Sequence, residues 1–192
     1  GLGMKCRTIY HVLDVPAEIA PQWDRVEEVD FLKTHELPRG KTPAIYLVRD
    51  PRDVFCSYAI WTQKSTEWTD ETSKIADAFI ENRSYGCSVS YGGWSEHVRQ
   101  WREAATFVLR YEDCYIDPIG ALQRVLNIQE RSGDMPNFES LQENCNWYFQ
   151  RGRPGRWGDM PEWLVRKTED LHGEMMREMG YLDKSPSEQG NY

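Results

Sequence analysis

The sequence predicts a single α/β domain, a three-layer α/β/α arrangement in which helices cover both faces of a parallel sheet. Two short apolar, β-branched segments, 29–35 and 44–48, precede or alternate with segments whose apolar residues recur at helical spacing. Parallel strands need a crossover connection, which is usually a helix, so this alternation predicts a parallel sheet. The continuous apolar run over 44–48 is typical of a strand that is covered on both faces.

The remaining elements follow from the same periodicities, with glycine-rich and proline-rich segments between them. A third strand is predicted from Thr106 to Tyr111. Helices are predicted over 53–63, 74–82, 95–103, 118–127, 138–144 and 161–179, with Ser95 as an N-cap and Gly180 as a C-terminal stop. We expect residues 183–192 to form a flexible tail.

The composition limits the class of protein. Of 192 residues, 40% are hydrophobic and 8 are tryptophan, which is enough to bury a core without disulfides or a metal. The formal net charge of −8 argues against a general nucleic-acid binder, because such proteins need a basic face. No window approaches the roughly 18 consecutive apolar residues of a membrane helix, and no charged-then-apolar leader opens the sequence. We therefore expect a soluble, cytoplasmic protein.

The cysteines and histidines do not form a metal-binding pattern. The 5 cysteines are widely spread and never form a Cys-x-x-Cys pair, so we expect reduced thiols rather than zinc ligands or a disulfide framework. The 4 histidines also lack ligand spacing, and we expect no metal.

The segment "AIYLVRDPRDVFCSYAIW" over 44–61 joins a strand to a helix through two arginines. Asp50 is a good N-cap, Pro51 fits the first helical position, and Asp53 completes a box-like cap. Arg49 leaves the strand beside the positive end of this helix, and Ser57 adds a hydroxyl one turn further along. These donors together suit a phosphate monoester.

A simpler interpretation of the same segment is equally consistent with it. Arg49 and Arg52 could pair with Asp50, Asp53 or glutamate side chains and form a solvated surface cluster. The choice between the two depends on the motifs elsewhere in the chain.

Four segments in order resemble motifs of the soluble sulfotransferases that use 3′-phosphoadenosine 5′-phosphosulfate (PAPS). They are "FLKTHELP", "YLVRDPRDVFCSY", "FVLRYED" and "FQRGRPGRW", and they extend from Phe31 to Trp157. The resemblance implies a P-loop NTPase-like α/β/α fold and an enzyme that binds PAPS and releases the desulfated nucleotide, PAP.

The resemblance also implies roles for residues that bind the nucleotide. Arg49 and Ser57 would hold the 3′-phosphate, Tyr111 would line the adenosine pocket, and Arg151 and Gly152 would close over the 3′-phosphate. Without the resemblance, Tyr111 would be a half-buried strand tyrosine, and the arginines over 151–156 a solvated basic loop.

Two further residues receive roles in the chemistry. The resemblance implies that His35 is the general base for the acceptor and that Lys33 lies beside the sulfuryl group. A histidine at a strand end suits proton transfer near neutral pH. Taken alone, His35 would be a structural histidine.

The sequence departs from the family at two places. Nothing in residues 1–30 matches the family's first strand, its loop similar to Pro-Lys-Ser-Gly-Thr-Thr and its helix, which cradle the 5′-phosphosulfate. We therefore expect residues 1–192 to lack this element and an upstream segment, a partner chain or a swapped segment to supply it. Gln150 stands where the family usually has arginine, which predicts weaker nucleotide binding unless Arg153 replaces the contact.

The sequence therefore predicts a sulfotransferase that moves the sulfuryl group of PAPS to a hydroxyl or amine of a small acceptor. A catalytically inactive PAP- or PAPS-binding or interaction module is the alternative. A nucleotide kinase fits less well, because it needs a Gly-rich Lys-Ser/Thr loop and a magnesium-binding carboxylate. We expect no nucleic-acid or membrane partner, and a homodimer or segment swap is consistent with the missing element.

Overall fold

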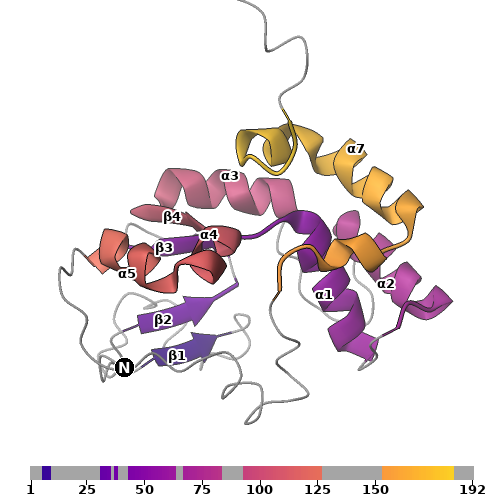
Figure 1. Cartoon of the computed structure of the whole chain (residues 1–192), viewed down its shortest axis with the longest axis horizontal. Helices are drawn as coiled ribbons and strands as arrows, with labels where there is room; N and C mark the ends of the chain where they lie inside the picture. The colour runs from indigo at the N-terminus through magenta and orange to yellow at the C-terminus, as the bar shows by residue number, and fades with distance from the viewer. Residues whose placement is uncertain are drawn as a thin grey trace, which may run out of the picture. The chain divides into compact units, whose positions relative to one another are not determined.

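The computed structural model describes residues 6–9, 31–35, 37–38, 43–63, 67–83, 93–126 and 153–183 (Figure 1). The chain divides into two compact units, residues 1–47 with 100–153 and residues 48–99 with 154–192, and each is described here by itself. The predicted helix 138–144, the predicted tail beyond Asp183, Arg151 and Gly152 lie outside the described residues. One domain over 1–192 with a flexible tail stays a prediction.

The first unit contains short strands. Strand β1 (Cys6–Ile9) pairs in parallel with β2 (Phe31–Thr34), with Thr8 opposite Lys33. This pairing confirms the predicted parallel sheet, although β1 itself was not predicted. Strand β3 (Ile45–Val48) pairs with β4 (Phe107–Arg110).

Strand β3 corrects one prediction. Its burial alternates, with Tyr46 and Val48 buried and Ile45 and Leu47 exposed, so the strand is not covered on both faces. A continuous apolar run does not reveal how many of its faces are covered, because hydrophobicity and accessibility are separate properties.

The elements that follow β4 include one helix that the sequence did not predict. Helix α4 (Tyr111–Ile116) starts directly after β4, so Tyr111 opens a helix instead of ending a strand, which corrects that prediction. Helix α5 (Pro118–Leu126) agrees with the predicted helix to within one residue. Ser95 is not an N-cap as predicted, because helix α3 (Trp94–Ala104) already includes it.

The second unit is helical. It contains α1 (Pro51–Gln63), α2 (Asp70–Ile80), the short 3₁₀ helix η3 (Arg156–Asp159) and α7 (Glu162–Glu178). Helix α2 begins four residues before the predicted start because Thr69 caps it: the Thr69 hydroxyl accepts from the Thr72 N–H at 3.1 Å. Gly180, with φ of 73°, follows α7 as the predicted stop.

Helices α1, α2 and α7 surround the core of the second unit (Figure 1). The largest fully buried apolar side chains of this core are Phe55, Ile60, Ile75, Ile80, Leu164 and Met176. The Phe55 and Phe79 rings meet edge to face, with centroids 5.4 Å apart. Within the described residues, no helix combines the length and the apolar character needed to cross a membrane.

His172 on α7 is buried in this core. Its Nε2 lies 3.1 Å from the Ile80 carbonyl oxygen, which can only accept, so Nε2 carries the proton in the neutral ring. Nδ1 then accepts from the Ser95 hydroxyl at 2.8 Å. Burial lowers the pKa of His172, and the hydrogen bond to Ile80 opposes this effect.

The lowered pKa of His172 predicts a loss of stability in mild acid. An unfolded histidine has a pKa of about 6.5, so below that pH the unfolded state takes up a proton before the folded state does. The free energy of unfolding should therefore fall as the pH drops below about 6.5, until the pH reaches the folded pKa. Urea denaturation between pH 7.5 and 5 should show this slope in the native protein and a shallower one in His172→Asn. Parallel curves would contradict the prediction.

Candidate anion-binding site at the start of helix α1

The start of α1 is fixed by the cap that the sequence predicts. The Asp50 side chain accepts from the Arg52 N–H at 2.9 Å, and the Asp50 carbonyl accepts the first helical bond from Val54 at 3.0 Å. Pro51 has no N–H and the Arg52 N–H is already bound, so the first two helical residues offer no free donor to a ligand. The positive end of the helix, which was expected to favour an anion, therefore adds no backbone donor from these two residues.

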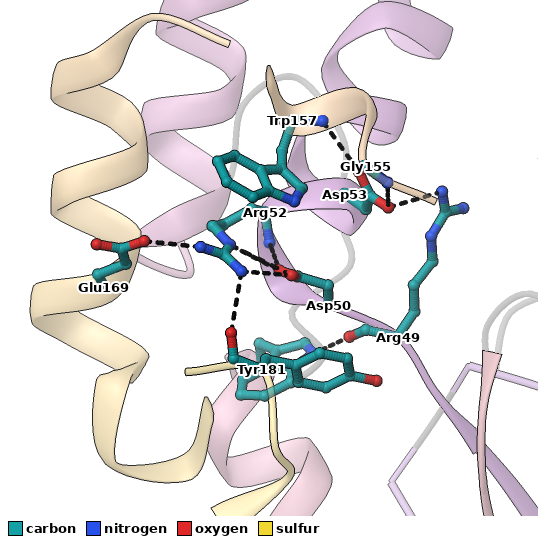
Figure 2. Close-up of polar contacts among 9 residues, drawn as sticks. Arg49, Asp50, Arg52, Asp53, Gly155, Trp157, Glu169 and Tyr181 are labelled. Atoms are coloured by element: carbon teal, nitrogen blue, oxygen red, sulfur yellow. Dashed lines mark hydrogen bonds and ion pairs between the residues drawn. The ribbon is translucent and has the colours of Figure 1, made fainter. Parts of the chain in front are cut away.

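Arg52 joins the start of α1 to α7 (Figure 2). Its Nη2 and Nε bind the Asp50 carboxylate at 2.7 and 3.0 Å, and its Nη1 binds Glu169 at 2.8 Å. Nη2 also donates to the Tyr181 carbonyl at 3.1 Å, and the guanidinium lies 4.0 Å from the centre of the Trp157 ring. Burial acts to lower the pKa of Arg52, but Asp50 and Glu169 outweigh it and raise the pKa.

These contacts test the simpler interpretation of the arginines. The pairs that the simpler interpretation predicted are present, but the side chain of Arg52 is only 8% exposed and Asp53 is 1% exposed. The cluster is therefore buried rather than solvated. A buried ion pair is costly to form and more costly to break, because breaking it leaves a desolvated charge.

Asp53 connects Arg49 to the chain around η3 (Figure 2). Its Oδ2 accepts from Gly155 N at 2.9 Å and from Arg49 Nη2 at 3.2 Å, and its Oδ1 accepts from Trp157 N at 3.0 Å. The box-like cap predicted for Asp53 does not include these partners, two of which are more than 100 residues away in the sequence. The only local signal was Arg49 four residues before Asp53, a spacing that favours an ion pair.

Arg49 lies just before α1, and Ser57 lies on the second turn of that helix. The Arg49 carbonyl accepts from Trp94 Nε1 at 3.2 Å, and the Arg49 side chain is 19% exposed beside Asp53. Ser57 lies one turn after Asp53 and is exposed. A guanidinium just before α1 and an accessible hydroxyl on its second turn are both donors that suit a phosphate ester.

The other predicted site residues belong to the first unit. Lys33 lies in β2, His35 follows that strand directly and is exposed, and Tyr111 opens α4 with its ring centroid 6.4 Å from that of Tyr115. Their arrangement relative to Arg49 and Ser57 stays a prediction. So do the roles of Arg151 and Gly152, which are outside the described residues.

The described part of the chain contains no group of three or more His, Cys, Asp or Glu side chains suited to a metal ion. Cys56 and Cys114 are free thiols, as predicted for these two residues. Burial raises the pKa of the Cys56 thiol to about 11, which makes it a poor nucleophile near neutral pH.

Comparison with known proteins agrees with the four motifs. A family profile described as "Sulfotransferase domain" matches residues 9–160. Mouse sulfotransferase 4A1 is 25% identical over 165 residues, which cover 77% of this chain and 56% of that protein. Rat sulfotransferase 2A2 is 36% identical over 92 residues, which cover 45% of this chain and 30% of that protein.

A solved structure extends the likeness to the fold. The structure of mouse sulfotransferase SULT7A1 complexed with PAP superposes with a TM-score of 0.67 at 19% identity, covering 95% of this chain and 77% of that one. The chain belongs to the sulfotransferase domain family and has the α/β fold that was predicted. It spans about half the length of mouse sulfotransferase 4A1.

The Arg52 cluster predicts a large difference between two arginine variants. Arg52→Ala would leave Asp50 buried without its cation and should lower the free energy of unfolding by about 3–5 kcal/mol. Arg166→Ala removes an exposed pair with Glu162 on α7 and should cost no more than about 0.5 kcal/mol. Urea denaturation at neutral pH measures both. Equal losses would show that burial of the Arg52 cluster does not carry the effect.

Proposed function

We propose that this protein binds PAPS and transfers its sulfuryl group to a hydroxyl or amine of a small acceptor. The observation that carries the proposal is the partly exposed Arg49 guanidinium bound to Asp53, one helical turn before the exposed Ser57, in a chain that belongs to the sulfotransferase domain family. Both residues stand at the positions that the family motif implies for the 3′-phosphate.

The described residues fit a phosphate monoester. The Arg49 guanidinium supplies charge and directional N–H donors, and the exposed Ser57 hydroxyl supplies one more donor. Asp53 offsets part of the Arg49 charge, so further positive groups would strengthen the site. Arg151 and Gly152 are proposed for this role, and Arg153, which is exposed, stands close to them in sequence.

The chemistry needs a base and a positioned donor. PAPS would supply the sulfuryl group, and this type of transfer depends more on positioning and charge stabilisation than on covalent catalysis. His35 is exposed directly after β2, so its ring is accessible to an acceptor and can take the acceptor's proton. Lys33 is proposed to lie beside the sulfuryl group and Tyr111 beside the adenosine.

Several finer points also stay proposals. The acceptor is proposed to be a small molecule, and the protein to act in the cytoplasm. A homodimer or a swapped segment would be one source of the family's 5′-phosphosulfate loop.

Sulfuryl transfer from labelled PAPS to a panel of phenols, alcohols and amines tests the function. The native protein should label at least one acceptor, and His35→Ala should reduce the rate by about 100-fold or more, because general-base catalysis contributes that much. His97→Ala, a histidine on α3 to which the motifs assign no role, is the matched control and should retain the rate. Binding of PAP without transfer to any acceptor would instead identify an inactive nucleotide-binding module.

A further inference from the structure

We propose that Asp53 is a positioning residue of the anion site, which holds the Arg49 guanidinium and the chain at Gly155–Trp157 in place before the nucleotide binds. This inference rests on the proposed function, because it concerns the same 3′-phosphate. Asp53 itself is not proposed to touch the ligand.

Both oxygens of Asp53 are used, and their donors come from two distant parts of the sequence. Oδ2 binds Arg49 and the Gly155 N–H, whereas Oδ1 binds the Trp157 N–H. The Asp53 side chain is 1% exposed, so water does not compete for these bonds. One buried carboxylate thereby fixes the distance between the start of α1 and the chain that precedes and enters η3.

The effect on Arg49 is an effect on orientation. A guanidinium is a rigid planar fork with five N–H donors, so a carboxylate bound at Nη2 sets the direction of the whole fork. A long arginine side chain without such a partner samples many rotamers and would lose that freedom on binding an anion. The Asp53 carboxylate lowers the positive potential at the Arg49 guanidinium. In return it orders the Arg49 side chain in advance, so less rotamer freedom is lost when an anion binds.

The second effect of Asp53 is on the backbone at Gly155–Trp157. Gly155 has φ of 85°, a left-handed conformation that glycine adopts readily, and in this conformation its N–H points to Asp53. The Trp157 N–H bonds to the same carboxylate, and the Trp157 ring lies against Arg52. Asp53 therefore holds the chain at both Gly155 and Trp157 to the start of α1.

Asparagine cannot replace Asp53 in this arrangement. Its amide has one acceptor oxygen, and its NH₂ group would face an N–H donor of Gly155, Arg49 or Trp157. Asp53→Asn should therefore break at least one of the three bonds without changing the size of the side chain. Asp50→Asn is the matched control, because Asp50 is also a buried carboxylate at the start of α1 but binds Arg52 instead of Arg49. Asparagine also remains a good N-cap there.

The experiment compares the binding of PAP and of AMP, which lacks the 3′-phosphate, by calorimetry well below the unfolding temperature. Asp53→Asn should weaken PAP binding by about tenfold or more and change AMP binding by less than about twofold, because only PAP carries the group that Arg49 would hold. Asp50→Asn should change both affinities by less than about twofold. A general loosening of the fold would weaken both nucleotides, so the ratio of the two affinities separates positioning from stability.

Each outcome has a distinct meaning. An Asp53→Asn protein that binds PAP like the native protein, or that loses PAP and AMP equally, overturns the inference and leaves the proposed function standing. Failure of the native protein to bind PAP overturns the proposed function and the inference together. If Asp53→Asn does not fold, Asp53→Glu keeps the charge but displaces the carboxylate, and the same selective loss of PAP is expected from it.

Discussion

Two buried carboxylates in and just before the first turn of α1 hold the described part of the second unit together around its candidate site. Asp50 binds Arg52, which reaches α7 through Glu169, and Asp53 binds Arg49 together with two backbone N–H groups. Charges removed from water are costly, so such groups persist only where several partners satisfy them at once. Here the partners come from segments about 100 or more residues apart.

The two carboxylates have different proposed roles: Asp50 in stability and Asp53 in anion binding. Arg52 binds Asp50 and also contacts Glu169, the Tyr181 carbonyl and the Trp157 ring, so we assign this set of contacts to stability. Asp53 binds Arg49 and stands one helical turn before the exposed Ser57, so this pair is the one that the proposed function uses. An interaction that uses only part of a guanidinium's donor capacity can orient it and still leave it able to bind an anion.

Local patterns predicted the local features of the fold. The cap at Asp50, the proline at the first helical position and the glycine after α7 all depend on nearest neighbours in sequence, and each was found. Ser95 was wrong as a cap: α3 already includes it, and its hydroxyl donates to His172 on a distant helix instead. The role of Asp53 was missed for the same reason, since two of its three partners are decided by tertiary structure. The motifs predicted the family, and the comparisons confirm it.

The carbonyl of Tyr181, which accepts from Arg52, has a consequence for how the protein is made. During synthesis the start of α1 emerges from the ribosome long before Tyr181 does. The charged side chains of Asp50, Arg52 and Asp53 therefore stay solvated until the later segments are made. Contacts between such distant positions close late and slow the search for the native state. The region around Arg49 therefore folds late, after most of the chain has been synthesised.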